Sequence, residues 1–403
     1  MNFRQDRSEK YDVVITDCNN RIGYNVLRSL AGKNLNVVVG VDQNSGMAVY
    51  SLHKDKIFRH PAFYKNEKAF INQLYKFFVD KKPHVCIPTG EDIFVVAKHF
   101  DKIKDLPVIV PISDFNTLDR LHDKYKSALL AKSLGIPTPQ TLKPNNKNDI
   151  IKFLEKIKGT IVLKILSSSG ARGVFYLNEN GFFAELDKIM KKEKINFGDF
   201  LIQQYIKGIG YGVSMLFNNG QLRAKFAHKR LRERSFTGAP STLRISIRNI
   251  ILEEYAERLL SNVGFHGVAM VEFKHNEQTG DSWFIEVNPR FWGSVALAIQ
   301  SGVDFPYLLY QMAVEGDITP CLDFQTGIVV KWLLGDILGV ISYVKASRSI
   351  KGLKQVSSRV DGYDDFRFDD PFVLPAEFFL YLKKIISTNY SKRKQLIFNR
   401  IFY

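Results

Sequence analysis

The chain has 403 residues, of which 45% are hydrophobic and 24% are charged, and its formal net charge is +16. These fractions are typical of a globular protein with two or three domains. The positive charge favours anionic partners, namely nucleotides, acidic substrates, acidic lipid surfaces or nucleic acid. The segment 1–10 lacks the apolar stretch of a signal peptide. The cysteines Cys18, Cys86 and Cys321 have no metal-binding or redox spacing and fit a reducing cytosol, so we expect a cytoplasmic protein.

The N-terminal part alternates short apolar strands with helices. Strands at 11–17 and 35–41 flank a helix at 24–31, which predicts a parallel α/β sheet. Asp42 follows the second strand, where dinucleotide-binding enzymes hold the ribose. However, the turn at 18–23 has one glycine, and a dinucleotide site needs several for close approach of the backbone to pyrophosphate. The sequence therefore argues against NAD binding.

A further carboxylate lies at the carboxyl end of a later strand in this part of the chain. Glu91 follows the strand at 85–87 and begins the next helix. Open α/β sheets bind ligands at this end of their strands. A carboxylate at a helix start also has a purely structural use, and both interpretations of Glu91 stay open.

Two lysines lie in patterns that suggest phosphate binding. Lys124 lies in an amphipathic helix within residues 113–134. Lys164 interrupts an apolar strand at 160–165, and an ammonium buried there needs an anionic partner. The sequence SSSGARG follows at 167–173, and small residues let backbone N–H groups surround phosphate oxygens. The P-loop pattern is missing, and a flexible serine linker is the alternative.

A strand at 200–206 precedes a hairpin whose turn is Asn-Asn-Gly at 218–220. The second strand of this hairpin runs into a basic cluster that includes Arg230, and Arg244 follows. Such a cluster could be a solvated edge or a nucleic-acid surface, but the aromatic platforms that stack on bases are sparse here. We favour a cradle for an anionic substrate and its acyl phosphate, formed by Arg230 and Arg244. His228 is either a base or a structural histidine.

The most informative stretch is a predicted hairpin with strands at 268–273 and 283–287. Glu272 and Glu286 interrupt its apolar strands, and strand alternation places Glu286 and Asn288 on one face. Two carboxylates and an amide oxygen suit Mg²⁺. Arg290 could hold a phosphate oxygen in a bidentate fork. The alternative is that the glutamates only pair with surplus basic residues on a solvated sheet face.

The C-terminal part gives fewer signals. The apolar stretch 327–344 is interrupted by Lys331 and Asp336, which are costly at a bilayer centre, so we expect a buried or membrane-surface helix. The last residues, 382–403, mix basic with apolar side chains. This segment could bind acidic lipid or a protein partner.

The strings LHDKYKSALLAKSLGIPTP at 121–139, VEF at 271–273 and FIEVNPRFWGS at 284–294 resemble the ATP-grasp superfamily. The likeness is to its carboxylate–amine ligases, including the ATP-binding domain of the carbamoyl-phosphate synthetase large chain. It covers about residues 11–316 and is most specific from Lys164 to the hairpin. Where many members have a ribose-binding glutamate after the hinge, this chain has Gly210.

The resemblance implies roles for individual residues. ATP would be held by Lys124, Lys164, Ser168, Ser169, Gly170, Gln203, Gln204, Tyr205 and Ile206. The last four would line the adenine, and the two lysines would contact phosphates. Mg²⁺ or Mn²⁺ would be bound by Glu272, Glu286 and Asn288. Arg290, Lys164, Arg230 and Arg244 would serve catalysis, with Arg290 on the γ-phosphate.

The resemblance also implies a domain order of α/β and α+β class. A parallel α/β pre-ATP-grasp domain would span 1–113. The ATP-grasp fold with antiparallel sheets would span 114–316, divided into a lid subdomain at 114–199 and a metal-binding subdomain at 200–316. A C-terminal extension would span 317–403.

The implied activity is the joining of a small-molecule carboxylate to an amine through an acyl phosphate, with release of ADP and phosphate. Two alternatives stay open. The acceptor could be bicarbonate, as in biotin carboxylase relatives. The protein could also be a non-catalytic binder of nucleic acid or membrane surfaces. A homodimer is compatible with the resemblance.

Overall fold

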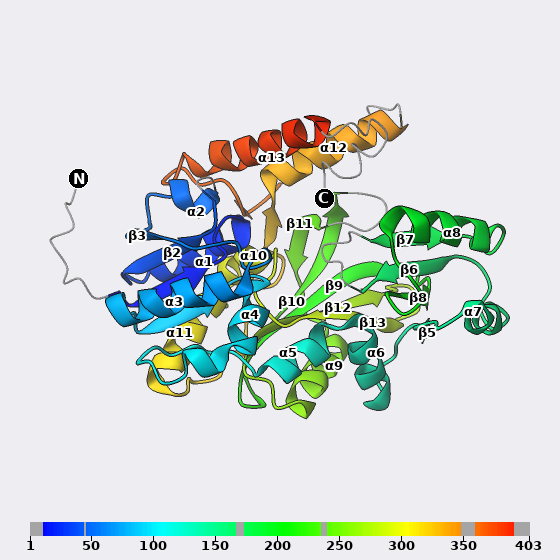
Figure 1. Ribbon diagram of the computed structural model, residues 1–403, viewed down its shortest axis with the longest axis horizontal. Coiled ribbons are helices and arrows are strands. Elements are labelled where there is room, and N and C mark those ends of the chain that lie inside the picture. Colours follow the sequence, from blue (N-terminus) through cyan, green and yellow to red (C-terminus); the bar gives the residue numbers. More distant parts are fainter. Residues whose placement is uncertain (1–10, 44–45, 167–172, 235–239, 348–358, 391–403) are drawn as a thin grey trace.

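The computed structural model describes residues 11–43, 46–166, 173–234, 240–347 and 359–390. Within these ranges the strands form three sheets, of four, seven and four strands. Figure 1 shows the N-terminal sheet at one end, the large sheet in the middle and the small sheet at the other end. Two helices of the C-terminal extension, α12 and α13, lie across the upper edge of the molecule.

The N-terminal sheet is parallel, with strand order β3-β2-β1-β4, which confirms the predicted parallel α/β unit. Every residue of β1 and β2 is buried, because helices cover both faces of a parallel sheet. Alternate side chains of β1 enter different cores: Val13 and Ile15 pack with α1, α10 and α11, and Val14 packs with α3 and α4. The strands are β1 Val13–Thr16, β2 Val37–Val41, β3 Lys56–Arg59 and β4 Val85–Pro88. The helices are α1 Arg21–Ala31, α2 Met47–Tyr50, α3 Glu67–Lys81, α4 Asp92–Lys98, the 3₁₀ turn Phe100–Lys102, α5 Phe115–His122 and α6 Lys124–Ser133.

The small sheet is antiparallel and has the strand order β5-β8-β6-β7. Its apolar face packs under α7 and α8 around Leu163, Leu177 and Phe200. The strands are β5 Thr141–Leu142, β6 Ile161–Ile165, β7 Val174–Leu177 and β8 Phe200–Gln204, and the helices are α7 Lys147–Leu154 and α8 Phe182–Glu193. The sequence predicts that β8 belongs to the metal-binding subdomain at 200–316. Here it pairs with β5 and β6, because its alternating apolar side chains complete the core of the small sheet.

The large sheet has the order β13-β12-β9-β10-β11-β14-β15. All neighbours in it are antiparallel except β14 and β15. The predicted turn between β9 and β10 is present, with Asn219 at φ 47° and Gly220 at φ 84°, as a type I′ hairpin requires. The strands are β9 Ile209–Asn218, β10 Gln221–Glu233, β11 Ser241–Ser246, β12 Gly267–His275, β13 Ser282–Asn288, β14 Val329–Lys331 and β15 Gly362–Tyr363. The helices around it are α9 Ile250–Asn262, α10 Val295–Gln300 and α11 Phe305–Glu315.

The C-terminal extension is continuous with the large sheet, since β14 pairs with β11 and β15 pairs with β14. The apolar stretch 327–344 is divided between β14 and α12 Leu333–Ser347. α13 spans Val373–Tyr390 and packs against α2 and α12. Within the described residues, no helix combines the length and apolar character needed to cross a bilayer.

Candidate active site

A pocket of about 380 Å³ lies between the large sheet, the small sheet and the N-terminal domain. It is large enough for a nucleotide-sized ligand. Most of the residues singled out in the sequence line it: Lys124, Lys164, Gln203, Gln204, Tyr205, Ile206, Arg230, Arg244, Glu272, Glu286, Asn288 and Arg290. Ser168, Ser169 and Gly170 lie outside the described residues. The pocket therefore brings together residues from strands and helices that are far apart in the chain.

The hairpin of β12 and β13 places its carboxylates side by side. Glu272 is directly opposite Glu286 in the antiparallel register, and Met270 is opposite Asn288. Opposite residues point to the same face of a sheet, so Glu272, Glu286 and Asn288 share the face that lines the pocket. The Asn288 amide donates to Glu272 Oε1 at 3.2 Å. Two glutamates on opposite faces of the sheet could not share a metal site. The observed register places them on the same face.

Arg230 on β10 is already paired with acids of the pocket. Its guanidinium donates to Glu272 Oε2 at 2.5 Å and lies 3.4 Å from Glu233. Burial raises the pKa of Glu272, Arg230 opposes this shift, and Glu286 and Glu233 add to it. Three carboxylates thus crowd around one arginine, and a further cation would relieve their repulsion.

Gly210 on β9 makes room for this arrangement. A Cβ atom there would lie 2.7 Å from Arg230 Cδ and 3.3 Å from Glu233 Oε1. A side chain at position 210 would therefore collide with Arg230. The carboxylate of Glu233, which comes from the neighbouring strand, reaches the space above the glycine.

Lys164 and Lys124 reach the pocket from β6 and from the first position of α6. Burial lowers the pKa of Lys164; Glu286 opposes this shift, and Lys124 adds to it. Two ammonium groups close enough to repel each other form a natural site for an anion. The carboxylates of the hairpin lie within range of both charges.

The other end of the pocket is largely apolar. Beside the hinge residues 203–206 lie Pro139, Val162, Val174, Phe273 and Ile285. The side chain of Gln203 is buried and donates to Thr141 Oγ1 at 2.8 Å. A flat apolar slot next to an exposed strand end can hold a planar aromatic ring, while backbone groups fix its edge.

Arg290, which follows β13, connects the hairpin to the N-terminal domain. It donates through Nε and a terminal nitrogen to Glu91 Oε1, at 3.1 and 2.8 Å. Burial raises the pKa of Glu91, but Arg290, His122 and Lys124 together outweigh it, and the net pKa is lowered. Glu91 therefore lies in direct contact with Arg290, a predicted site residue, and also stands at the start of α4.

Arg244 on β11 is held by the C-terminal extension. Both oxygens of Asp364 accept from its terminal nitrogen at 2.5 Å, and both side chains are buried. Asp364 also lies 3.5 Å from Arg21, whose guanidinium packs on the Trp332 ring. Arg21 and Arg244 both line the pocket. At this end of the pocket, Arg21 of the N-terminal domain and Arg244 of the large sheet are both oriented by Asp364 of the C-terminal extension.

His228 lies on β10 at the same end and is almost fully buried. Burial, Arg230 and Arg244 lower its pKa well below the usual value, so the imidazole is neutral at neutral pH. Its Nε2 lies 3.3 Å from Ser294 Oγ, and its Nδ1 has no hydrogen-bond partner among the described residues. A neutral imidazole with an unused nitrogen can accept a proton.

The region around the pocket matches a known family. A family model described as "ATP-grasp in the biosynthetic pathway with Ter operon" matches residues 196–335, from the start of β8 into α12. The solved structure of N5-carboxyaminoimidazole synthetase from Staphylococcus aureus, complexed with ADP, superposes with a TM-score of 0.64, over 88% of this chain and 93% of that one. The chain thus has the fold of these structures, and its residues 196–335 match an ATP-grasp family model.

Other ATP-grasp relatives are similarly distant. The L-amino acid ligase of Bacillus licheniformis is 17% identical, with a TM-score of 0.60 over 78% of each chain, and the Staphylococcus aureus synthetase is 18% identical. At these identities the likeness concerns the fold. The tetrahydromethanopterin:alpha-L-glutamate ligase of Methanocaldococcus jannaschii is 26% identical over 137 residues, 34% of this chain and 46% of that protein. The chain spans less than half of the length of the curated relatives it matches.

Several residues of this pocket were not foreseen. Arg21 lies just beyond the carboxyl end of β1, where ligands bind in open parallel sheets, and this position could have indicated it. Glu233 and Asp364 had no such signal. Glu233 contacts Arg230 three residues earlier on the same strand, whereas Asp364 contacts Arg244 on a strand that only the folded sheet brings near.

Proposed function

We propose that this protein is an ATP- and Mg²⁺-dependent ligase that activates a carboxylate and joins it to an amine. The observation that carries the proposal is the pairing of Glu272 with Glu286 on one sheet face, beside Lys164 and Lys124 in one pocket. Carboxylates bind the metal and lysines bind phosphate, so a pocket with both suits a metal–nucleotide complex better than either ligand alone.

The residues present fit a hard divalent cation such as Mg²⁺ or Mn²⁺. Glu272, Glu286 and Asn288 offer oxygen ligands from adjacent strands, and burial together with the carboxylates of Glu286 and Glu233 raises the pKa of Glu272. No group of three or more His, Cys, Asp or Glu side chains arranged for a metal occurs in the described part of the chain. Mg²⁺ usually keeps several water and phosphate ligands beside one or two carboxylates, and these would complete the coordination here. When bound, the cation would offset the charge of the phosphate oxygens.

The proposed reaction has two steps. A carboxylate oxygen of the substrate forms a bond to the γ-phosphorus of ATP, and the bond from that phosphorus to the β–γ bridging oxygen breaks, which releases ADP. The amine then attacks the acyl carbon of the resulting acyl phosphate, phosphate leaves, and the nitrogen loses a proton. His228 lines the pocket and has a ring nitrogen without a hydrogen-bond partner among the described residues, and we assign the uptake of that proton to it.

The role of the protein in the first step is control of charge. An anionic carboxylate must approach an anionic phosphate, and Lys124, Lys164 and Arg290 reduce this repulsion. The cationic end of the pocket, with Arg21 and Arg244, lies on the side away from the apolar slot and would receive the acid substrate. The slot at residues 203–206 would receive adenine.

The proposed function is tested by measuring ADP release with a panel of amino acids and sugar acids, with mass detection of the product. We expect release that requires one acid and one amine together, and a product mass equal to their sum minus water. ADP release stimulated by bicarbonate alone would instead identify a bicarbonate-activating enzyme. Absence of ADP release with every acceptor would leave a non-catalytic nucleotide-binding fold.

Gly210 stands where many ATP-grasp proteins have the glutamate that binds the ribose of ATP, so another acid would have to bind the ribose here. We propose that Glu233 accepts hydrogen bonds from the ribose hydroxyls, because its carboxylate reaches the space above Gly210. Glu233→Gln is expected to raise the KM for ATP about tenfold with little change in kcat, since a hydrogen bond to a charged group contributes about 1.5–3 kcal/mol.

The comparison with 2′-deoxy-ATP separates this role from a structural one. The wild-type protein should prefer ATP over 2′-deoxy-ATP, and Glu233→Gln should lose most of that preference. A variant that keeps the full preference would show that Glu233 only orients Arg230.

A further inference from the structure

One helix of the C-terminal extension exposes an apolar face that the proposed ligase activity does not use. Along α13 and the residue before it, the exposed side chains Phe372, Pro375, Phe378, Phe379 and Leu382 recur every three or four residues. At 100° per residue they occupy an arc about 120° wide on the helix. We call this set the α13 apolar face. Phe378 is 50% exposed, Phe372 57% and Phe379 64%, and large aromatic side chains in a row are rarely left so open.

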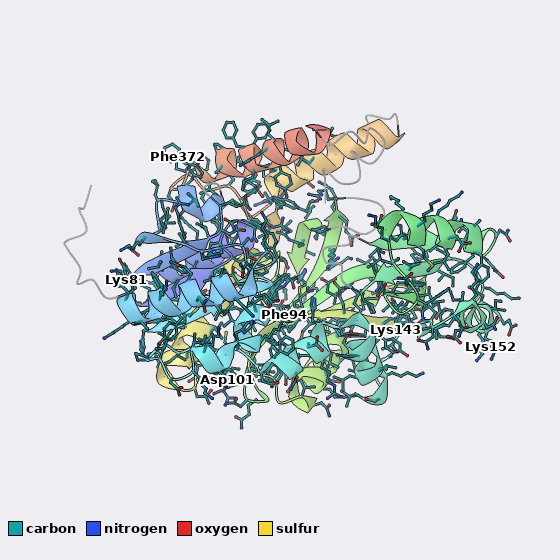
Figure 2. All side chains as sticks on the ribbon, in the orientation of Figure 1. Lys81, Phe94, Asp101, Lys143, Lys152 and Phe372 are labelled. Atoms are coloured by element: carbon teal, nitrogen blue, oxygen red, sulfur yellow. The ribbon has the colours of Figure 1, made fainter. Side chains whose placement is uncertain are left out.

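The opposite side of α13 already accounts for the packing of the helix. Val373, Ala376 and Glu377 are buried, and Glu377 accepts a hydrogen bond from the Trp332 indole at 3.1 Å. The helix therefore has its own buried face against the protein, and the α13 apolar face is a second one. Figure 2 shows Phe372 at the upper edge of the molecule, and Phe372 is not among the residues that line the pocket.

The apolar surface continues onto neighbouring segments. Phe368, just before α13, is 91% exposed, and Tyr50 and Leu52, at the end of α2 and shortly after it, are also exposed. α2 packs against α13, and the backbone N–H of Leu52 donates to Asp370 at 3.0 Å. Exposed apolar side chains therefore occur on segments that pack next to α13 as well as on α13 itself.

The acidic residues next to this face point away from it. Asp364 is paired with Arg244, Asp365 accepts from the N–H groups of Leu333 and Leu334, and Asp370 accepts from Ser51, all buried. Asp369 is partly exposed but is paired with Arg28. These aspartates are therefore paired with cations or hydrogen-bond donors of the protein, whereas the phenylalanines near them stay exposed.

The charge that follows the face is basic. Lys383 is exposed directly after Leu382, and the chain from Lys383 to Tyr403 contains six Lys and Arg residues and no Asp or Glu. Apolar side chains that insert into a bilayer, together with a basic segment attracted to anionic headgroups, form the two signals that stable peripheral binding needs. Pairing of two copies through this face would instead bring two copies of Lys383, without an acidic partner in the sequence after it, to one interface.

We propose that the α13 apolar face docks on an anionic lipid bilayer. The phenylalanines would enter the boundary between headgroups and acyl chains, and Lys383, directly after the face, would lie at the level of the headgroups. The proposal does not depend on which acid or amine the pocket takes.

The test is sedimentation of the full chain with vesicles of phosphatidylcholine alone and of phosphatidylcholine with phosphatidylglycerol. We expect binding to the anionic vesicles, weak binding to the neutral ones, and loss of binding as salt rises from about 0.1 M to about 1 M, where the Debye length falls from about 10 Å to about 3 Å. The double variant Phe378→Gln/Phe379→Gln should bind at least about tenfold more weakly.

The matched control is Ile250→Gln/Ile251→Gln, which removes two exposed apolar side chains from the start of α9. It should bind vesicles like the wild type, and both variants should keep the wild-type unfolding temperature. Equal binding by Phe378→Gln/Phe379→Gln and wild type would overturn the proposal. So would a wild-type protein that ignores vesicles but forms a dimer that the phenylalanine variant dissociates, since the face would then pair with a second copy.

Discussion

Replacing Glu286 by glutamine is expected to lower ATP turnover by at least about a thousandfold while the protein stays folded. Glutamine keeps the size of the side chain but removes the negative charge that faces Glu272 and Lys164. The metal site would retain one carboxylate, and Lys164 would lose the anion that opposes its desolvation. The measurement is ADP release at saturating ATP and Mg²⁺, with thermal unfolding as the check on the fold.

The matched control for this substitution lies in the same hairpin. Glu277 in the loop between β12 and β13 is bonded to Lys229 and Tyr211 outside the pocket. Glu277→Gln should leave turnover within about twofold of wild type, because surface ion pairs contribute about 1 kcal/mol or less and do not reach the site. Wild-type ADP release from Glu286→Gln would reject the assignment of the metal site.

The second large effect is expected on stability. Asp364→Leu should destabilise the protein by about 3–5 kcal/mol, because it leaves the guanidinium of Arg244 buried without its anion. The loss should appear as a lower midpoint of urea denaturation. Since Arg244 and Arg21 line the pocket, the KM for the acid substrate should also rise.

Two variants test the physical reason for this loss. Asp369→Leu removes a neighbouring carboxylate that is 58% exposed and paired with Arg28, and it should cost about 1 kcal/mol or less. The double variant Asp364→Leu/Arg244→Met removes both buried charges and should recover most of the stability lost in Asp364→Leu. If the loss of unfolding free energy in the double variant equalled the sum of the losses in the two single variants, Asp364 and Arg244 would not act as a pair.

The parts of the fold that depend on local patterns could be predicted from the sequence. Buried runs such as VVIT in β1 identify a parallel sheet, and the alternation of Glu286 and Asn288 in β13 places both on one face. The position of Glu272 opposite Glu286 does not follow from the hairpin loop alone: the register that pairs Phe273 with Phe284 would place Glu272 opposite Ile285, and a β-bulge between Glu272 and Phe273 shifts it to Glu286. The candidate site was accessible to sequence analysis where one short segment supplies several of its residues.

The other parts of the site depend on register and on contacts across the chain. Arg230 is expected from the sequence to hold the substrate; it lines the pocket, but its contacts to Glu272, two strands away, and to Glu233 cannot be seen in the sequence. Arg244 and Asp364 are 120 residues apart, and the segment around Asp364 reads only as acidic and aromatic. No short-range pattern in the sequence specifies such a pair.

The bond between Asp364 and Arg244 has a consequence for how the protein is made. Arg21 leaves the ribosome early and Arg244 in the middle of synthesis, but the acid that orients both arrives near the end of the chain. The half of the cavity that we assign to the nucleotide is formed by β6, β8, β12 and β13, which are all synthesised before Asp364. The half with Arg21 and Arg244 is completed only when β15, next to Asp364, pairs with β14. A nascent chain stalled before residue 364 would therefore have its ATP-binding half in place but not the arrangement that we assign to the acid substrate.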